Sequence, residues 1–386
     1  LKDVVYKVTA CILCIMMVAA VMTPSFAANS KATNASLKSK SIVSLKQTKW
    51  STKTRLSKST KKHLKDTKIY NLNSSNNVRA MMGSDGNLVV RVKNFDGDRN
   101  IERQKWIDMV VALGGVHNAD GLNWGKVNVG RLKFHTAGIS LPDDCSTFFR
   151  FFKGEIYGCE SLNTSDVINM SFMFRWTAKA DPNVSNWDTS KVTDMEGMFL
   201  LASANPDVSK WNTSNVTNMK GMFDRAGNAD PDVSNWDTSK VENMSRMFYF
   251  ASNATPNVKN WNTPNVTDMS GMFKGAEKAN PDVSNWDISN VTDMKDMFSG
   301  SGIKKADLSK WKLNKDGSNG TLQSGHMFDG CEALEYLKTP AGLGTIVKGG
   351  NYDFKIIRLK KGDPVTIEKE NQNFGGMESA YVINAA

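Results

Sequence analysis

One phrase returns through the middle of this chain about every 25 residues, a period in the range of solenoid repeats. Its copies begin near residues 181, 205, 230, 255 and 280, with a divergent sixth copy near 305, and the last clear copy reads NPDVSNWDISNVTDMKDMF. A single copy is too short to bury its own Val, Trp, Met and Phe side chains, whereas stacked copies share a continuous core. The repeat therefore predicts a solenoid.

Each copy predicts a short helix in its second half. In the first copy, Met195, Met198, Phe199 and Ala202 stand at i, i+3, i+4 and i+7, which is the spacing of one helix face. Thr193 stands where an N-cap is expected, and a glutamate three residues later completes a capping box. We expect about two helical turns, covered by the neighbouring copies because so short a helix is marginal alone.

The first half of each copy predicts a strand. In PNVSNW, Pro182 suits the entry to a strand, and Val184 points to the opposite side from Asn183 and Ser185. The predicted fold is therefore α/β, a leucine-rich-repeat-like solenoid with one short parallel strand and one short helix per repeat. An N-terminal α+β cap and a small C-terminal β cap are expected to cover its ends.

Two aromatic columns are predicted to form the core. The tryptophan column is Trp187, Trp211, Trp236, Trp261, Trp286 and Trp311. The phenylalanine column is Phe174, Phe199, Phe223, Phe248, Phe273, Phe298 and Phe328. Six tryptophans in register are more consistent with packing than with a ligand cage, and the paired methionines likewise indicate packing.

The predicted domain boundaries divide the chain into five parts. These are a signal peptide (1–27), a basic linker (28–68), an N-terminal α+β capping domain (69–141), the solenoid (142–338) and a C-terminal β-rich cap (339–386). In the first cap, NLVVRVK predicts a strand, and ERQKWIDMVVAL predicts a helix with Trp106, Met109, Val110 and Leu113 on one face. In the second cap, YDFKIIRL and VTIEKE predict strands.

The N-terminal segment has the features of a secretory signal. Lys2 and Lys7 precede an apolar run from Ala10 to Val21, and small residues follow in TPSFAA before Ala28. The run is too short to span a bilayer comfortably, so no transmembrane segment is expected in the mature chain. We expect the protein to be secreted or held at the cell surface.

The basic charge is concentrated in one segment. The chain carries a formal net charge of +10, of which residues 28–68 contribute +11, while residues 69–386 carry −2. Few large apolar residues occur in 28–68, so this segment is expected to be a disordered linker. It could act as a solvated spacer or as a tether to an anionic cell-wall polymer or lipid. The nearly neutral remainder argues against nucleic acid as a partner.

The motifs NVTDMSGMFKGA, SKVTDMEGMF, YGCESL and FDGCEAL resemble those of BspA-like bacterial surface proteins with Treponema-type leucine-rich repeats. The resemblance covers about residues 142–338. It differs in two ways, since most copies have Ala where that group has Cys, and Pro-Asp-Val replaces a Leu-rich strand. The resemblance implies an extracellular protein that adheres to host proteins, host cells or other bacteria, and it does not imply catalysis.

A polar surface is the candidate binding site. Its residues are predicted to face away from the core on successive strands. They are Asn183, Ser185, Asp207, Ser209, Asp232, Ser234, Asn257, Lys259, Asp282 and Ser284. Asp207 and Asp232 on adjacent strands repel each other, so this row either meets a cationic partner or Ca²⁺, or consists of hydrated surface acids. No cofactor or metal site is predicted.

The sequence favours an adhesin or protein-interaction scaffold that binds an extracellular protein or glycan through this repeated polar face. The alternative is a structural cell-wall or matrix protein held by its basic linker. An enzyme is not predicted, because no nucleophile motif surrounds Cys145 or connects it to His117 or His135. A further alternative, binding of a regular lattice by Thr189, Thr213, Thr238 and Thr263, is weakened by Ile288 and Leu313 in the same column.

Two cysteines are predicted to be structural. Cys159 and Cys331 are assigned to the small buried column that holds Ala202 and Ser301 in other copies. Seven repeats apart, they are too distant to form a disulfide with each other. Cys145, just ahead of the repeats, is left unassigned.

Overall fold

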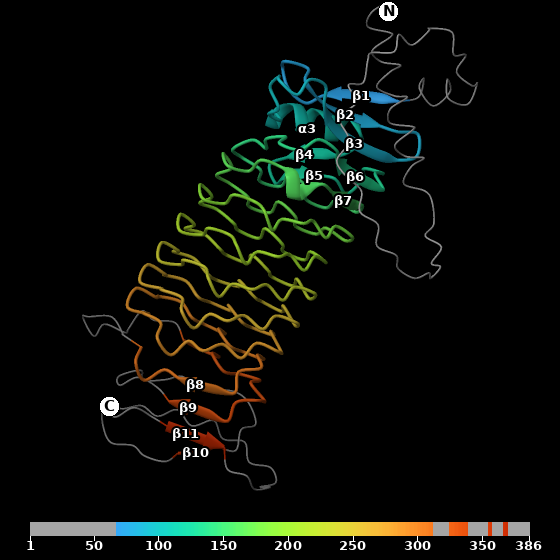
Figure 1. Cartoon of the computed structure of the whole chain (residues 1–386). Helices are drawn as coiled ribbons and strands as arrows, with labels where there is room; N and C mark the ends of the chain where they lie inside the picture. Colours follow the sequence, from blue (N-terminus) through green and yellow to red (C-terminus); the bar gives the residue numbers. More distant parts are fainter. Residues whose placement is uncertain (1–66, 312–323, 339–353, 357–365, 370–386) are drawn as a thin grey trace, which may run out of the picture. The chain divides into compact units, whose positions relative to one another are not determined.

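The computed structural model describes residues 67–311, 324–338, 354–356 and 366–369 (Figure 1). The chain divides into two units between Lys68 and Ile69, and the described residues from Ile69 onward belong to the second. The predicted signal peptide, all but the end of the basic linker and most of the C-terminal cap lie outside the described residues.

A mixed five-stranded sheet begins this unit, with its strands in the order β1-β2-β3-β6-β7 (Figure 1). The strands are β1 Lys68–Asn71, β2 Val78–Met82, β3 Asn87–Val92, β6 Arg131–Phe134 and β7 Glu155–Tyr157. β2 and β3 are antiparallel, whereas β6 pairs in parallel with both β3 and β7. Along β3, fully and partly buried residues alternate, as expected for a strand with one face on a core.

One α-helix, α3, occurs among the described residues, and it spans Arg103–Ala112 within the segment where the sequence predicts a helix. Its Trp106 ring stacks on Phe148 with ring centroids 4.2 Å apart. The indole nitrogens of Trp106 and Trp124 donate to the carbonyl oxygen of Phe148 at 3.2 and 2.8 Å. A short hairpin of β4 (Val116–Asn118) and β5 (Gly121–Asn123) follows the helix. Phe148 lies in a coil that precedes the first clear copy of the motif and is bridged to the next coil at Asp144 and Asn169. The helix and the stacked coils therefore share one core.

The repeats are stacked coils, each coil being one copy of the sequence motif (Figure 1). Single parallel β-bridges connect residues 24 or 25 positions apart. The bridged residues are Asp144, Asn169, Asp194, Asn218, Asn243, Asp268 and Asp293, each paired with the next. The repeat in the sequence is therefore a repeat in space.

The segment predicted to be helical in each copy is a run of turns instead. In the first copy, the amides of Met198 and Ala202 donate to carbonyl oxygens three residues earlier, at 3.2 and 2.9 Å. The amides of Met195 and Phe199 donate to carbonyl oxygens of the next coil, both at 2.9 Å. Alternate amides thus close a turn or join the next coil. The predicted repeat of strand plus helix is wrong, because no α-helix occurs in the described residues after Ala112.

The close spacing of the coils explains why a helix does not form. Phenylalanine rings of this segment stack with centroids 5.4 to 5.7 Å apart from Phe174 to Phe298. An α-helix with its side chains is about 10–12 Å wide, so helices could not stack at this distance. A helix would also use the amides that here bond to the next coil. The left-handed backbone at Gly197 and Leu201, with φ of 55° and 57°, is likewise incompatible with a helix.

The predicted strand is also absent from the five clear copies. Each carries a proline, and proline has no amide hydrogen to donate to a neighbouring strand. The side chain before the proline provides a contact instead, since Asp181 Oδ1 accepts the amide of Asn205 at 3.2 Å, and Asn205 Oδ1 that of Asp230 at 2.8 Å. In the sixth copy Ala306 replaces the proline, and there the strand β8 (Lys305–Asp307) forms.

The six tryptophans of the predicted column lie in the core, each only 1 to 4% exposed. From Trp187 to Trp286 their rings stack with centroids 6.1 to 6.5 Å apart and planes within 7° of parallel. Each indole nitrogen also donates to the preceding coil, as Trp211 does to the carbonyl oxygen of Val184 at 3.1 Å. The column therefore contributes apolar packing and a buried hydrogen bond at every coil.

The phenylalanines of the second column and the methionines beside them are almost completely buried. The fully buried members are Phe174, Phe199, Phe223, Phe248, Phe273 and Phe298, together with the methionines that stand four positions and one position before each of them. From Phe174 to Phe298, neighbouring rings of this column are within 9° of parallel. The two aromatic columns form one continuous core through the coils.

A mixed four-stranded sheet follows the last clear coil, in the order β10-β11-β9-β8. β9 is Tyr336–Lys338, β10 is Phe354–Ile356 and β11 is Thr366–Lys369. β8 and β9 are parallel, whereas β11 is antiparallel to both β9 and β10. The parallel stacking of coils therefore gives way to antiparallel pairing at this sheet.

Candidate interaction faces

The predicted polar residues occupy matching turns on successive coils, and we call the ten of them the polar row. In four coils, Oδ1 of the first residue accepts the serine amide at 3.0 to 3.2 Å and the serine hydroxyl at 2.6 to 2.7 Å. These pairs are Asn183–Ser185, Asp207–Ser209, Asp232–Ser234 and Asp282–Ser284. In the remaining coil, Asn257 Oδ1 accepts the amide of Lys259 at 3.4 Å. The row is thus built from side chains that cap their own turns.

These hydrogen bonds favour ionised aspartates. The hydroxyl and amide of Ser209 lower the pKa of Asp207, and those of Ser234 lower the pKa of Asp232. The neighbouring Asp207 charge raises the pKa of Asp232, but this effect is smaller. Among the described residues, no hydrogen bond or ion pair engages Oδ2 of Asp207 or Asp232. Each exposed carboxylate therefore keeps one oxygen for a partner.

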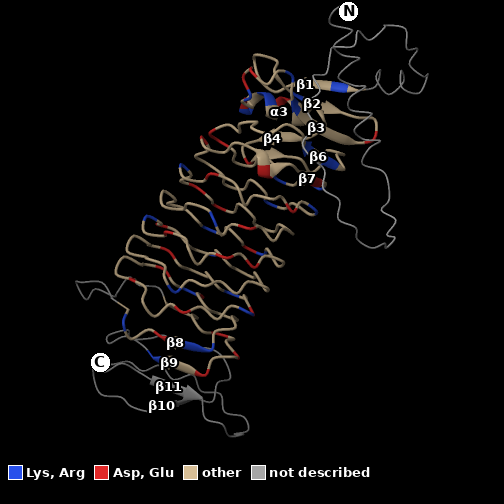
Figure 2. Cartoon of the chain, in the orientation of Figure 1, with Lys and Arg blue, Asp and Glu red and all other residues tan. Residues whose placement is uncertain are grey.

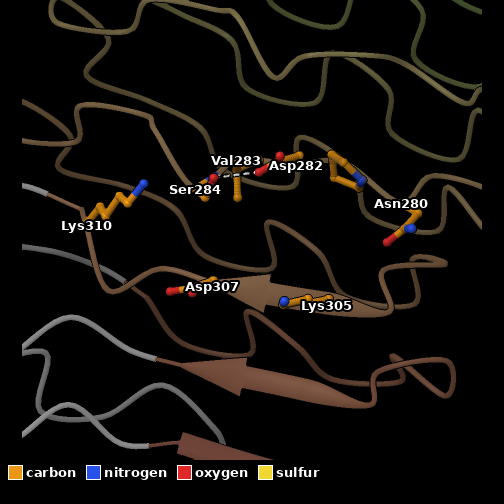
Figure 3. Close-up of a pocket in the computed structure, with 8 residues that line it drawn as sticks. Asn280, Asp282, Val283, Ser284, Lys305, Asp307 and Lys310 are labelled. Carbon is orange, nitrogen blue, oxygen red and sulfur yellow. Dashed lines mark hydrogen bonds between the residues drawn. The ribbon is translucent and has the colours of Figure 1, made fainter.

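The row deepens at its last described coils into a hollow of about 330 Å³ (Figure 3). Asp282 and Asp307 lie on neighbouring coils, with Lys305 and Lys310 nearby (Figure 3). A hydrogen bond from Ser284 and the cation of Lys259, 3.7 Å away, lower the pKa of Asp282. The hollow therefore has charges of both signs. Among the residues that the structure describes, no group of three His, Cys, Asp or Glu side chains could hold a metal ion.

The threonine column is buried instead of forming a flat outer surface. Thr189, Thr213, Thr238 and Thr263 are each 1% exposed. Their hydroxyls donate to main-chain oxygens of the next coil at 2.7 to 2.9 Å. These threonines connect coils and cannot contact an external lattice.

The three described cysteines are free and buried. Cys145 occupies the position that Met195 has in its coil. The amide of Cys145 donates to the carbonyl oxygen of Asn169 in the next coil at 2.8 Å, as the amide of Met195 donates to that of Asn218. Burial raises the pKa of Cys145 well above its ordinary value, and its thiol donates to the carbonyl oxygen of Pro142 at 3.2 Å. His117 and His135 are both exposed. The structure gives the buried thiol no hydrogen bond to either imidazole among the described residues.

The predicted register of one cysteine is wrong. Cys331 lies in the small column, where its thiol donates to the carbonyl oxygen of Phe298 at 2.9 Å. Cys159 instead occupies the position of Val184, because its carbonyl oxygen accepts the indole of Trp187 at 2.8 Å as that of Val184 accepts Trp211. The first coil is irregular in length, so counting residues from its neighbours misplaced this cysteine.

A second surface, which the sequence analysis missed, lies on the turns that replace the predicted helices. We call it the aromatic–arginine face, and it consists of Arg150, Arg175, Trp176, Arg225, Arg246, Tyr249 and Phe250. Its backbone is continuous, since Trp176, Leu201 and Arg225 each donate an amide hydrogen bond to the next coil at 2.6 to 2.9 Å. Trp176 and Phe250 are each 47% exposed, in contrast to the buried tryptophan column.

Cations and rings alternate on this face. The guanidinium of Arg246 lies 4.2 Å from the centroid of the Tyr249 ring, and that of Arg225 lies 5.0 Å from the same centroid. Both arginines also pair with the carboxylate of Asp224, at 3.2 Å from Arg225 and 2.9 Å from Arg246. Burial raises the pKa of Asp224, and the two guanidinium groups offset this only in part. Tyr249 and Asp224 thus hold both arginines in place.

The sequence does contain a signal for this face. Three coils have glycine in the EGMF, KGMF and SGMF segments, where Arg246 of this face stands in SRMF and the neighbouring Phe172 stands in SFMF. The backbone at this position is left-handed whether or not the residue is glycine, with φ between 55° at Gly197 and 60° at His326. The sequence alone therefore shows large residues at positions where other copies have glycine. The predicted helix gave no reason to expect a left-handed backbone at these positions.

Residues 143–254 and 227–336 each match the family described as Mycoplasma protein of unknown function, DUF285. The two matches together cover just over half of the chain, and they coincide with the stacked coils. The chain belongs to this family. No curated protein and no solved structure matches the chain. Basic and acidic side chains both occur along the coils that match the family (Figure 2). In the described part of the chain, no helix is long and apolar enough to span a bilayer.

Proposed function

We propose that this chain is a secreted or cell-surface protein that acts as an adhesin or interaction scaffold for an extracellular protein or glycan. The observation that carries the proposal is the return of an exposed carboxylate, with one oxygen held by a serine, at Asp207, Asp232 and Asp282 in matching turns of the coils. Equivalent groups at fixed spacing raise apparent affinity through effective concentration, even when each contact is weak. The polar row is the proposed contact surface.

Membership of the BspA-like group of surface proteins is part of this proposal. BspA-like repeat proteins share the matched domain, and this supports a surface location. The resemblance to Treponema-type leucine-rich repeats is one of sequence motifs only. The five clear coils contain neither a helix nor a strand. The family description supplies no ligand, so the surface itself has to be tested.

Charge reversal along the row is the direct experiment. The full chain with Asp207→Lys, Asp232→Lys and Asp282→Lys is compared with the wild type for binding to extracellular-matrix proteins and to whole host and bacterial cells. A matched variant with asparagine at the same three positions keeps Oδ1 as an acceptor for the serines but removes the charge. We expect binding to fall in the asparagine variant and to be lost in the lysine variant. Unchanged adhesion in both would remove the polar row from the function.

A second candidate function is that of a structural cell-wall or matrix protein held by residues 28–68. The observation that favours it is the net charge of +11 in that segment. Such attachment is electrostatic and is therefore screened by salt. Deletion of residues 28–68 should abolish retention by cells, and high salt should release the intact protein. Retention that survives both treatments contradicts this candidate.

A further inference from the structure

We propose that the aromatic–arginine face is a second binding site, one that takes an acidic, partly apolar protein segment. It lies on the turns of residues 146–151, 171–176, 220–225 and 245–250, whereas the polar row lies in the first half of each coil. This inference goes beyond the proposed function and does not depend on the polar row.

The backbone at four of these residues is less favourable for a side chain than for glycine. Trp176, Arg225, Arg246 and Phe250 have φ of 60°, 55°, 57° and 51°. The left-handed region costs a residue with a Cβ about 1–2 kcal/mol relative to glycine. The same two columns hold glycine in other coils, as at Gly275 with φ of 68°. Glycine would thus serve the fold better, and strain of this kind gathers at functional sites.

The rings are held in place yet remain half exposed. A Cβ on Gly275 would lie 2.6 Å from the Phe250 ring, which shows that this ring rests against the glycine backbone of the next coil. The Trp176 ring packs on Phe151 with centroids 5.7 Å apart. Each ring therefore packs against the protein on one side and is exposed to solvent on the other. Because the rings are already held in place, a partner can bury them with little loss of side-chain entropy.

The charges on this face are unbalanced. Arg225 and Arg246 share the single carboxylate of Asp224. Among the described residues, no carboxylate lies within ion-pair distance of Arg150 or Arg175, and the Nε atom of each is buried without a hydrogen-bond partner. The Arg175 charge also lowers the pKa of Arg150, after the larger effect of burial. The charge of Asp120 raises the pKa of Arg150, but no ion pair joins the two among the described residues. Asp224 is thus the one carboxylate paired with these four described cations, and added carboxylates would relieve their repulsion.

These features together favour a protein partner. Guanidinium groups bind carboxylates through paired hydrogen bonds, and Trp, Tyr and Arg are the residues enriched at the centres of protein interfaces. The apolar side chain of Leu201 lies between Trp176 and Arg225 in the hydrogen-bonded column and adds apolar surface. A polyphosphate chain fits less well, because it has no apolar groups to cover the half-exposed rings of Trp176 and Phe250. Aspartate or glutamate alternating with apolar residues is the chemistry that fits.

The test uses the full chain and a fluorescent peptide in which glutamate and leucine alternate. A Gln-for-Glu peptide, hyaluronate and an oligothymidylate serve as comparisons for charge, acidic glycan and phosphate polymer. The variants are Trp176→Gly with Phe250→Gly, and separately Arg150→Glu with Arg175→Glu. We expect the Glu–Leu peptide to bind best and each double variant to weaken it about tenfold or more, as for interface hot spots.

The glycine variants separate binding from stability. Because glycine suits the left-handed backbone, Trp176→Gly with Phe250→Gly should unfold at the same or a higher urea concentration than the wild type while it loses the peptide. Asp207→Lys in the polar row should leave peptide affinity unchanged, so failure here is distinguishable from failure of the proposed adhesin surface. The inference is overturned if the glycine variants bind the peptide as the wild type does. It is equally overturned if hyaluronate or oligothymidylate binds better than the peptide, or if the peptide does not bind.

Discussion

Helix α3 and the turns of the first clear coil have the same apolar spacing but different structures. In α3 and the residue after it, Trp106, Met109, Val110 and Leu113 stand at i, i+3, i+4 and i+7, and the same spacing holds from Met195 to Ala202. The first segment is helical, and the amide of Leu113 donates to the oxygen of Met109 at 3.0 Å. The second is a run of turns. Apolar spacing thus shows that one face is buried, but not where the amides bond.

The neighbours of each segment account for the difference. α3 has no parallel copy of itself alongside, so its amides bond within the helix. Each turn segment lies between two copies of itself, and alternate amides find carbonyl oxygens in the next coil. Glycine marks the distinction only in some copies, because α3 contains none and Gly197 and Gly221 stand inside turn segments, but the turn at residues 245–250 also has no glycine. The following predictions test this comparison.

The largest effect is expected from opening a gap in a stacked column. Phe223→Ala should lower the free energy of unfolding by about 3–5 kcal/mol, because it removes a fully buried ring that packs on both neighbouring coils. Urea denaturation followed by circular dichroism measures the loss, with the half-exposed Phe250→Ala as the control. A loss for Phe223→Ala no greater than that of the control would show that the stacked column does not stabilise the coils.

A pair of substitutions at one position distinguishes turn from helix directly. The backbone of Leu201 has φ of 57°. Leu201→Gly and Leu201→Ala remove nearly the same side chain, but in this left-handed conformation glycine should be more stable than alanine by about 1 kcal/mol. At the exposed Val111 in α3, the order should reverse by about the same amount, since glycine weakens a helix. Four urea titrations give both differences. The same order at the two positions would contradict the assigned backbone.

A smaller effect is expected from the side-chain bonds between coils. Thr213→Val keeps the shape of a fully buried side chain but leaves the main-chain oxygen of Asp237 without its donor, at 2.9 Å in the native protein. We expect a loss of about 1 kcal/mol in the free energy of unfolding. Ile288, which occupies this column naturally, provides the comparison, because Ile288→Val should cost only its methylene group. Equal, negligible losses would show that the threonine bonds contribute nothing.

The smallest effect concerns the ionisation of the polar row. Hydrogen bonds from Ser209 hold the pKa of Asp207 below its usual value, so they stabilise the fold above the unfolded pKa. This contribution is lost as the pH falls through the native pKa. Ser209→Ala should raise the pKa of Asp207 and leave that of Asp237, which is held down by Ser239, unchanged. Carboxyl carbon NMR titration of both residues is the measurement, and an unmoved Asp207 titration contradicts the capping role.

The sequence was informative about register and much less so about conformation. Identical positions in every copy of the repeat place the tryptophans and phenylalanines in columns, because only stacking buries them all. Helix and strand were inferred from local spacing, which cannot report that alternate amides bond to another coil. The proline in each clear copy was already a sign against a central strand. The aromatic–arginine face was missed because its positive φ values follow from turns that the helix prediction excluded.

The alternation of amide bonds also determines how such a protein can change in length. The amides of each coil donate to carbonyl oxygens of the next coil, and its own carbonyl oxygens accept the matching amides of the coil before. Duplication or loss of one whole unit in the gene would preserve this match, and the molecule would gain or lose one layer with its ends intact. Insertion of a single residue inside a turn segment would turn Met and Phe toward water from that point onward. Gain or loss of whole units therefore preserves the stack, whereas insertion inside a turn segment breaks it.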